Sequence, residues 1–148
     1  MYAQNEQIHA AAWPGFSLYA GMAYALGPEV NTAASMIYAV EGQCFVLAAS
    51  CMVDKAMWTV LGINDAQKAM LPLGGGHARI YAPDGQEIAE RLPENQEGLI
   101  YADIDLDMIA LAKGAGDPAG HYSRPDVTRL LFDPTPSSTL ALWTFLIC

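Results

Sequence analysis

The chain has 148 residues, 53% of them apolar, which suits one folded domain with a sizeable core. Its formal net charge is −9 with no local cluster of Lys and Arg, which argues against binding to nucleic acid or to anionic membranes, and no apolar run is long enough for a membrane span. The three cysteines form no Cys-x-x-Cys motif, and the start lacks the features of a secretory leader, so we expect reduced thiols in a cytoplasmic protein.

In the first third of the chain, apolar stretches alternate with a glycine-rich segment. Residues 1–7 have the composition of the last turns of a helix. Residues 8–14, IHAAAWP, predict a buried strand that is closed by Pro14. Residues 15–29 contain three glycines and a proline, which is typical of a loop.

A helix followed by a strand is the next prediction. Asn31 or Thr32 is expected to cap a helix that ends at Gly42. Residues 44–50, CFVLAAS, are apolar without interruption, which predicts a strand buried on both faces. This order of elements favours a layered α/β or α+β fold.

Turn chemistry dominates the middle of the chain. Residues 52–70 are helical in composition, with a break at Asn64–Asp65. Residues 73–77, LGGGH, read as a hinge or a tight turn, because they lack the order of glycines and the Lys-Ser/Thr pair of a nucleotide-binding loop. Two alternating runs that meet at residues 83–85, Pro-Asp-Gly, predict a β-hairpin.

The last third begins as a further strand and helix and then changes character. Residues 97–106 alternate as a strand does, and Asp105 is expected to cap a short helix ended by Gly114. We assign residues 1–131 to one domain and residues 132–148 to a separate tail, which is first polar and proline-rich and then apolar. The tail is either a loosely packed appendage or an end that binds a partner or touches a membrane.

The cysteines and histidines give no catalytic pattern by themselves. A nucleophilic cysteine needs a nearby base, cation or helix N-terminus to lower its pKa. Cys44 has no charged neighbour in the sequence and Cys51 follows small residues, so both are expected to be inert core residues. The three histidines are far apart and none has a partner at metal-ligand spacing, so we expect surface or hydrogen-bonded histidines and no metal.

The remaining polar candidates also favour structural interpretations. Eight acidic residues between positions 84 and 107 fit a solvated face better than a catalytic carboxylate pair. Trp13 differs, because it ends a predicted strand just before a glycine-rich loop, and ligands bind at such strand ends in open sheets. Core packing is the alternative for this side chain.

Several stretches taken together resemble the C-terminal half of a nitrilase of the carbon–nitrogen hydrolase family. They are MYAQNEQIHAAAWPGFSLY, ALGPEVNTAASMIYAVEGQCFVLA, GGGHARIYAPDGQEIAE, EGLIYADIDLDMIALAK and DPAGHYSRPDVTRLL. They run in the family's order over residues 1–131 and look most similar to arylacetonitrilases and aliphatic nitrilases of microbes. The resemblance implies half of an α-β-β-α sandwich.

The resemblance also implies a reaction, and it implies that this chain lacks the residues that catalyse the reaction. Such enzymes hydrolyse nitriles to carboxylic acids and ammonia with a Glu-Lys-Cys triad and no cofactor. In the family all three triad positions precede the segment that Met1 begins, so the resemblance leaves this chain with no catalytic residue. It places Trp13 in the wall of the substrate pocket and treats Cys44 and Cys51 as ordinary strand positions.

The family's assembly gives the remaining expectations. The resemblance implies that the helix around residues 31–41 pairs subunits and that residues 117–127 lie along an assembly surface. The expected partners are a nitrile substrate in the parent enzyme and further copies of the chain. The alternative function is a non-catalytic assembly partner of a full-length nitrilase.

Overall fold

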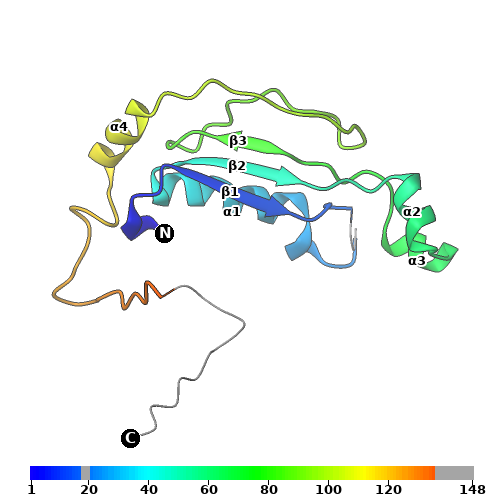
Figure 1. The fold of residues 1–148 in the computed structure, drawn as a ribbon, viewed down its shortest axis with the longest axis horizontal. Coiled ribbons are helices and arrows are strands. Elements are labelled where there is room, and N and C mark those ends of the chain that lie inside the picture. The colour runs from blue at the N-terminus through cyan, green and yellow to red at the C-terminus, as the bar shows by residue number, and fades with distance from the viewer. Residues whose placement is uncertain (18–20, 136–148) are drawn as a thin grey trace, which may run out of the picture.

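The computed structural model describes residues 1–17 and 21–135, and its centre is a three-stranded sheet with one long helix on one face (Figure 1). The sheet has the order β1-β2-β3. Its layers are formed by β1 (Ile8–Trp13), β2 (Phe45–Ser50), β3 (Arg79–Tyr81) and α1 (Pro28–Gly42). The other elements are η1 (Tyr2–Gln4), η2 (Tyr24–Leu26), α2 (Lys55–Leu61), α3 (Asp65–Met70) and α4 (Asp107–Ala115). The predicted layered α/β class is confirmed.

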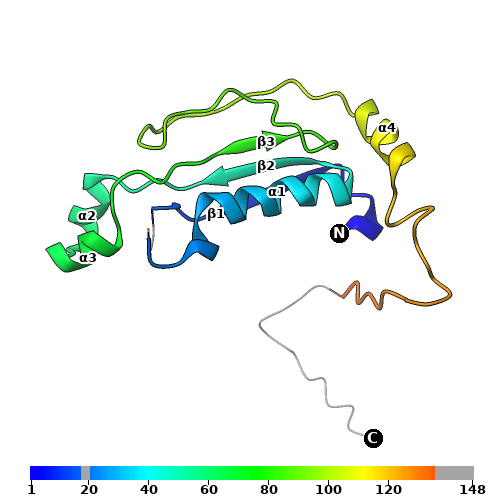
Figure 2. The same cartoon turned by 180° about the vertical axis from the view of Figure 1, so that it is seen from behind.

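Strands β1 and β2 are parallel, and α1 is the crossover between them. Their register runs from Ile8 opposite Phe45 to Trp13 opposite Ser50. Turning the molecule shows α1 in front of β1 in one view and behind it in the other (Figure 2). The helix begins at Pro28, whose fixed φ suits the first helical turn, so the expected cap at Asn31 or Thr32 was wrong. Asn31 instead donates its side-chain amide to the carbonyl oxygen of Gly27 at 2.7 Å.

The predicted hairpin is confirmed. Strand β3 pairs antiparallel with β2 and turns at residues 83–85. Gly85 has φ +84°, and its amide donates to the carbonyl of Ala82 at 2.8 Å. The return arm makes one isolated bridge, between Tyr81 and Glu87, and the Ile88 amide donates to the carbonyl of Ile80 at 3.0 Å. This turn brings Glu87 back onto the buried strand.

The sheet has a buried cluster on each face. The face under α1 packs Ala39, Cys44, Val46, Ala48 and Tyr81. The opposite face has a smaller cluster of Phe45, Ala82 and Ile109. The second cluster covers only the beginning of β2, because α4 and the return arm of the hairpin contact that end of the sheet.

The expectation that residues 44–50 are buried on both faces was wrong for the described chain, and so was the expectation that residues 8–14 form a buried strand. Alternate residues of both strands are exposed on the face opposite α1. Ile8 keeps 45% of its surface exposed and Leu47 keeps 38%. Both faces of these strands are apolar, but the described residues leave part of the face opposite α1 exposed.

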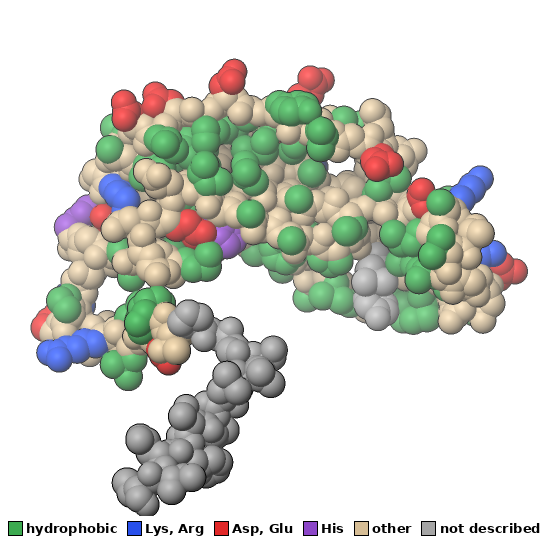
Figure 3. All heavy atoms as spheres, viewed as in Figure 1, with side chains coloured by type: hydrophobic (Ala, Val, Ile, Leu, Met, Phe, Trp, Pro, Cys, Tyr) green, Lys and Arg blue, Asp and Glu red, His purple; other side chains and the backbone are tan. Residues whose placement is uncertain are grey.

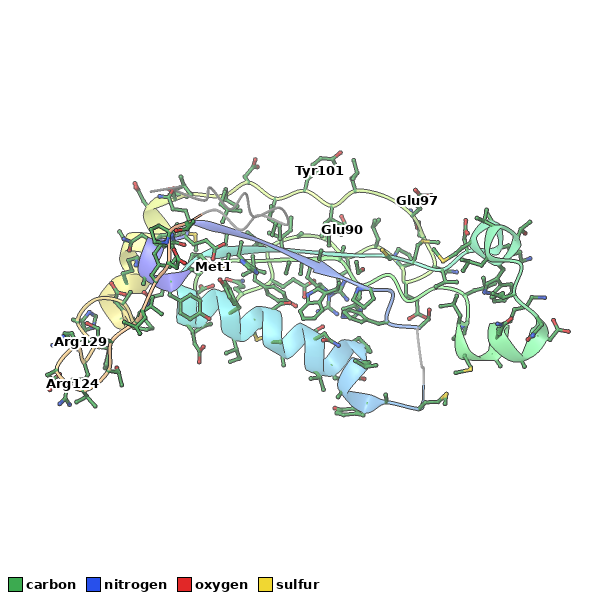
Figure 4. The ribbon with its side chains drawn as sticks, turned by 60° about the horizontal axis from the view of Figure 1, so that its bottom comes forward. Met1, Glu90, Glu97, Tyr101, Arg124 and Arg129 are labelled. Atoms are coloured by element: carbon green, nitrogen blue, oxygen red, sulfur yellow. The ribbon has the colours of Figure 1, made fainter. Side chains whose placement is uncertain are left out.

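The segment at residues 98–104 is extended, as predicted, but it forms no strand. No backbone–backbone hydrogen bond of the described chain involves these residues. Tyr101 points away from the sheet (Figure 4). The prediction of a strand over residues 97–106 was therefore wrong for the described chain, because no neighbouring strand pairs with this segment among residues 1–17 and 21–135.

The predicted break between the two middle helices is confirmed, but the predicted cap of α4 was wrong, because Leu106 and not Asp105 is its N-cap. Asn64 accepts from the amide of Gln67 and forms a capping box at the start of α3, which confirms the predicted break. Asp105 accepts from the amide of Asp107 at 3.0 Å at the start of α4, although the helix continues through Gly114 to Ala115. The predicted tail lies outside the described residues except for 132–135, where no helix or strand forms.

Candidate functional site

Cys44 is fully buried between α1 and the sheet, beside two charged groups that the sequence did not reveal. Its thiol lies within electrostatic reach of the Glu6 carboxylate and the Lys113 ammonium group. Burial raises the pKa of the thiol, Glu6 raises it further and Lys113 lowers it, with a net pKa of about 11. A glutamate and a lysine thus both act on this cysteine, but the thiol stays protonated at neutral pH and is not an activated nucleophile. The prediction that Cys44 is a core residue is confirmed, and its inertness stays a prediction.

Cys51 was wrongly predicted to be a core residue. It follows the last residue of β2 and its side chain is exposed. Its amide donates to the carbonyl of Trp13 at 3.2 Å, which holds the backbone against β1. The small residues before it predicted burial, but only Ala48 is buried, whereas Ala49 is exposed on the uncovered face and Ser50 ends the strand.

The two thiols are expected to differ strongly in reactivity. In the native chain at pH 8, iodoacetamide should modify Cys51 readily and should modify Cys44 at least about a hundredfold more slowly. The reason is that only about one Cys44 thiol in a thousand is ionised at this pH when its pKa is about 11. Tandem mass spectrometry of the labelled peptides measures both rates, and labelling in urea, where the rates should converge, is the control. Equal native rates would contradict the assignment of Cys44 as inert.

Trp13 lies at the carboxyl end of β1 and faces α1. Its indole N–H donates to the Ser35 hydroxyl at 2.9 Å, and that hydroxyl donates to the carbonyl of Asn31 at 3.0 Å. The indole packs against the cluster under α1 and its ring centre is 6.3 Å from that of Phe16. The side chain is half-buried, which is compatible both with core packing and with a place in the wall of a substrate pocket. Its role as a pocket residue stays a prediction.

A cavity of about 300 Å³ opens beside the carboxyl ends of β1 and β2. Its lining residues are Phe16, Ser17, Pro28, Pro72, Leu73, Gly75, Gly76, His77 and Glu94. The rings of Phe16 and His77 meet edge to face at 5.5 Å, so Trp13, Phe16 and His77 form a row of aromatic side chains along this end of the sheet. The sequence signal was the glycine run just after the predicted helical residues 52–70, which we interpreted as a hinge or a tight turn rather than as a cavity wall.

The glycine run is a tight turn that is hydrogen-bonded to two neighbouring segments, and it is not a hinge. Gly74 exchanges two backbone hydrogen bonds of 2.8 Å with Val53, and the amide of Phe16 donates to the carbonyl of Gly75 at 2.9 Å. Both glycines have positive φ, +92° and +83°, where residues with a side chain are strained. This turn therefore fixes the floor of the cavity.

His77 is held in its neutral form. Its amide donates to the Ser50 hydroxyl, and the guanidinium group of Arg79 lies 3.2–3.3 Å from both ring nitrogens. Burial lowers the pKa of His77, and the positive charges of Arg79 and Arg91 lower it further. The imidazole is accordingly uncharged at neutral pH and presents a polar edge without charge to the cavity. The prediction of a hydrogen-bonded histidine is confirmed.

A second polar cluster ties the start of the chain to α1. The Tyr38 hydroxyl donates to Glu6 at 2.6 Å, and His9 Nδ1 lies 3.0 Å from the other oxygen of that carboxylate. The rings of His9 and Tyr38 stack at 4.0 Å. Burial raises the pKa of Glu6, but the contacts with Tyr38 and His9 outweigh it, so that the pKa is lowered.

The substitution Glu6→Gln should make the chain less stable by about 1.5–3 kcal/mol at pH 7, the usual range for a hydrogen bond to a charged group. Because folding lowers this pKa, the contribution of Glu6 is present above its ordinary pKa and is lost as pH falls through the folded value. Urea unfolding of both proteins between pH 7 and pH 3 should show the difference shrinking in acid. The exposed Glu97→Gln is the control, and a difference that grows in acid would contradict the assignment.

Two searches of the described residues gave negative results. No helix among them is long and apolar enough to cross a membrane. In the same part of the chain, no three His, Cys, Asp or Glu side chains are grouped so as to hold a metal ion.

Comparisons with known proteins give the same family throughout. The model of the carbon-nitrogen hydrolase family matches residues 1–113. The chain is 61% identical over 93% of its length to a nitrilase of Pseudomonas syringae, 50% over 90% to an arylacetone-specific nitrilase of Alcaligenes faecalis, and 52% over 90% to an aliphatic nitrilase of Rhodococcus rhodochrous. It spans only 41%, 37% and 35% of the length of these relatives.

Proposed function

Because the chain belongs to the carbon–nitrogen hydrolase family, we propose that it is the C-terminal portion of a nitrilase, an enzyme that converts nitriles to carboxylic acids and ammonia. The observation that carries this proposal is the similarity to three nitrilases over at least 90% of the chain. One of these relatives is arylacetone-specific and another is an aliphatic nitrilase, so the proposal names the nitrile group and not the remainder of the substrate.

The chemistry needs a group that this chain is not expected to provide. A thiolate adds to the nitrile carbon and forms a covalent thioimidate, one water releases ammonia to leave a thioester, and a second water releases the acid. Cys44 is buried and protonated, and the described chain brings no carboxylate and ammonium group into hydrogen-bonding contact with Cys51. We propose that the Glu-Lys-Cys triad belongs to the part of the relatives outside the matched stretch, so that this chain alone does not hydrolyse nitriles.

The role of this chain would be to shape the pocket next to the triad. The place of Trp13 at the carboxyl end of β1, in the row with Phe16 and His77, supports a role in the pocket wall. The cavity of about 300 Å³ lies beside these residues, which supports the proposal that the substrate binds at this end of the sheet.

A covalent fusion tests the proposal. The part of the Pseudomonas syringae relative outside the matched stretch is joined to residues 1–148, and ammonia release is measured with an aliphatic nitrile and an arylacetonitrile. The fusion should be active, it should stay active with Cys44→Ala or Cys51→Ala, and the unfused chain should release no ammonia. Activity of the unfused chain that is lost with either cysteine would refute the site assignment.

A second candidate is a non-catalytic partner that binds an intact nitrilase through the outer side of α1. Exposed Met36, Ile37 and Val40 on that helix favour it. Co-elution of the chain with the intact Pseudomonas syringae relative, lost with Ile37→Glu, would support this function, and separate elution would count against it.

A further inference from the structure

The cavity at the carboxyl ends of β1 and β2 combines apolar side chains with a few polar groups, as small-molecule sites do. Its apolar side chains are Phe16, Pro28, Pro72 and Leu73, around a volume of about 300 Å³. No cysteine lines this cavity in the part of the chain that the structure describes. Under the proposed function, its wall would therefore contact the part of a substrate that lies away from the reacting nitrile group.

Three polar groups of the cavity wall already donate within the chain. The Ser17 hydroxyl donates to the carbonyl oxygen of Gly74 at 3.3 Å. The amide of Gly76 donates to the carbonyl oxygen of Glu94 at 2.9 Å. The backbone amide of His77 donates to a serine hydroxyl at the end of β2. These three hydrogens are therefore not available to a ligand.

The imidazole of His77 keeps one polar hydrogen for a ligand. Burial and the charge of Arg79 lower the pKa of His77, so the ring is neutral and carries one N–H donor and one acceptor nitrogen. The guanidinium group of Arg79 lies 3.2–3.3 Å from both ring nitrogens, but it can only donate and so satisfies the acceptor nitrogen alone. Among the described residues no acceptor is found for the remaining N–H of the ring.

The charges around the cavity favour an uncharged ligand group. Arg79 and Arg91 share the carboxylate of Glu87, at 3.1 Å and 2.7 Å. Glu94 lines the cavity itself. The wider surface is acidic as well, with a formal net charge of −9 and acidic side chains along the upper rim of the molecule (Figure 3). A ligand with a carboxylate would be repelled by this surface, whereas one with a neutral oxygen would not.

We propose that His77 is a specificity-determining residue, whose imidazole N–H binds an uncharged oxygen on the part of the substrate remote from the nitrile group. The preferred substrates are accordingly nitriles that carry a distal ether, hydroxyl or carbonyl oxygen. This inference rests on the proposed function and adds a substrate class to it. Phe16 supports the same role, because its ring meets that of His77 edge to face at 5.5 Å and provides an apolar surface beside the donor.

The test compares two nitriles of nearly the same shape, para-methoxyphenylacetonitrile and para-ethylphenylacetonitrile, which differ by an ether oxygen in place of a methylene group. The enzyme is the covalent fusion of residues 1–148 with the remainder of the Pseudomonas syringae relative, and the ratio of kcat/KM for the two nitriles is measured. His77→Phe keeps an aromatic ring but removes the N–H, and it should lower this ratio about three- to tenfold. Intrinsic differences in reactivity between the nitriles cancel, because each variant is compared with the unsubstituted fusion.

The matched control is Tyr101→Phe, which removes a polar hydrogen from an aromatic side chain that is 77% exposed and does not line the cavity. The control should leave the ratio unchanged. A ratio that stays unchanged in His77→Phe, or that falls equally in Tyr101→Phe, would overturn the assignment of His77.

Nuclear magnetic resonance on the unfused chain with isotope-labelled histidine needs neither a variant nor turnover. The imidazole N–H signal of His77 should shift on titration with the methoxy compound and stay in place with the ethyl compound. A selective shift together with an inactive fusion would count against the proposed function and leave the role of His77 standing. An active fusion whose ratio does not depend on His77 would count against that role alone. If the fusion is inactive, equal shifts with both compounds, or no shift, would overturn the role of His77.

Discussion

Glu87→Gln is expected to destabilise the chain by about 3–5 kcal/mol, the usual effect of removing one partner from a buried ion pair. Arg79 keeps only 6% of its surface exposed, and its Nε lies 3.1 Å from a carboxylate oxygen of Glu87. Burial lowers the pKa of Arg79, and Glu87 opposes that effect. Without the carboxylate, the guanidinium charge would remain buried beside the Ala78 carbonyl and the neutral ring of His77.

Urea unfolding followed by circular dichroism measures this loss. The matched control is Arg91→Gln, which removes the other cation that contacts Glu87, at 2.7 Å, from a side chain that is 65% exposed. A surface contact of this kind should contribute no more than about 1 kcal/mol. Equal losses for the two variants would show that burial of Arg79 does not determine the energetics of the cluster.

Gly75→Ala is expected to cost about 2–5 kcal/mol and to distort the cavity at the carboxyl end of the sheet. The residue has φ +83°, which costs a residue with a side chain about 1–2 kcal/mol. A Cβ atom there would also collide with the backbone nitrogen of Ser17, and such overpacking costs about 1–3 kcal/mol more. The collision pushes apart the two segments that line the cavity, so the edge-to-face contact of Phe16 with His77 should be lost as well.

Gly114→Ala is the matched control for this substitution. A Cβ atom at Gly114 would meet nothing within 4 Å, and the residue lies inside α4. The change should leave stability unchanged or raise it by about 0.5–1 kcal/mol, because alanine favours the helix. Thermal unfolding compares the two variants, and a neutral Gly75→Ala would contradict the assigned backbone strain.

Both predictions concern residues whose importance the sequence did not reveal. Glu87 was one of eight acidic residues assigned to a solvated face, and that interpretation holds for exposed members such as Glu90 and Asp103. Glu87 differs because the turn at residues 83–85 folds it back onto Arg79. A contact between two arms of a hairpin depends on register, which the acidic pattern alone does not specify.

Local patterns located most of the helices and strands, although not the start of α1 and not the extended segment at residues 97–106, which forms no strand. Apolar runs located β1 and β2, the Pro-Asp-Gly turn located the hairpin, and the Asn64–Asp65 break separated α2 from α3. These features depend on neighbouring residues and on turn and capping chemistry, which the sequence contains directly. The same sequence predicted, correctly, that Cys44 is a core residue, although it did not reveal that the charges of Glu6 and Lys113 act on its thiol.

The tertiary structure decided which apolar side chains are covered. The sequences of β1 and β2 are apolar on both faces, and only the arrangement of α1, α4 and the hairpin shows that Leu47 and Ala49 are left exposed while Phe45 is buried. It also decided that Cys51 is exposed and that the glycines after α3 form a cavity wall. Burial is a property of distant segments packed together, so no pattern within a single strand or turn can determine it.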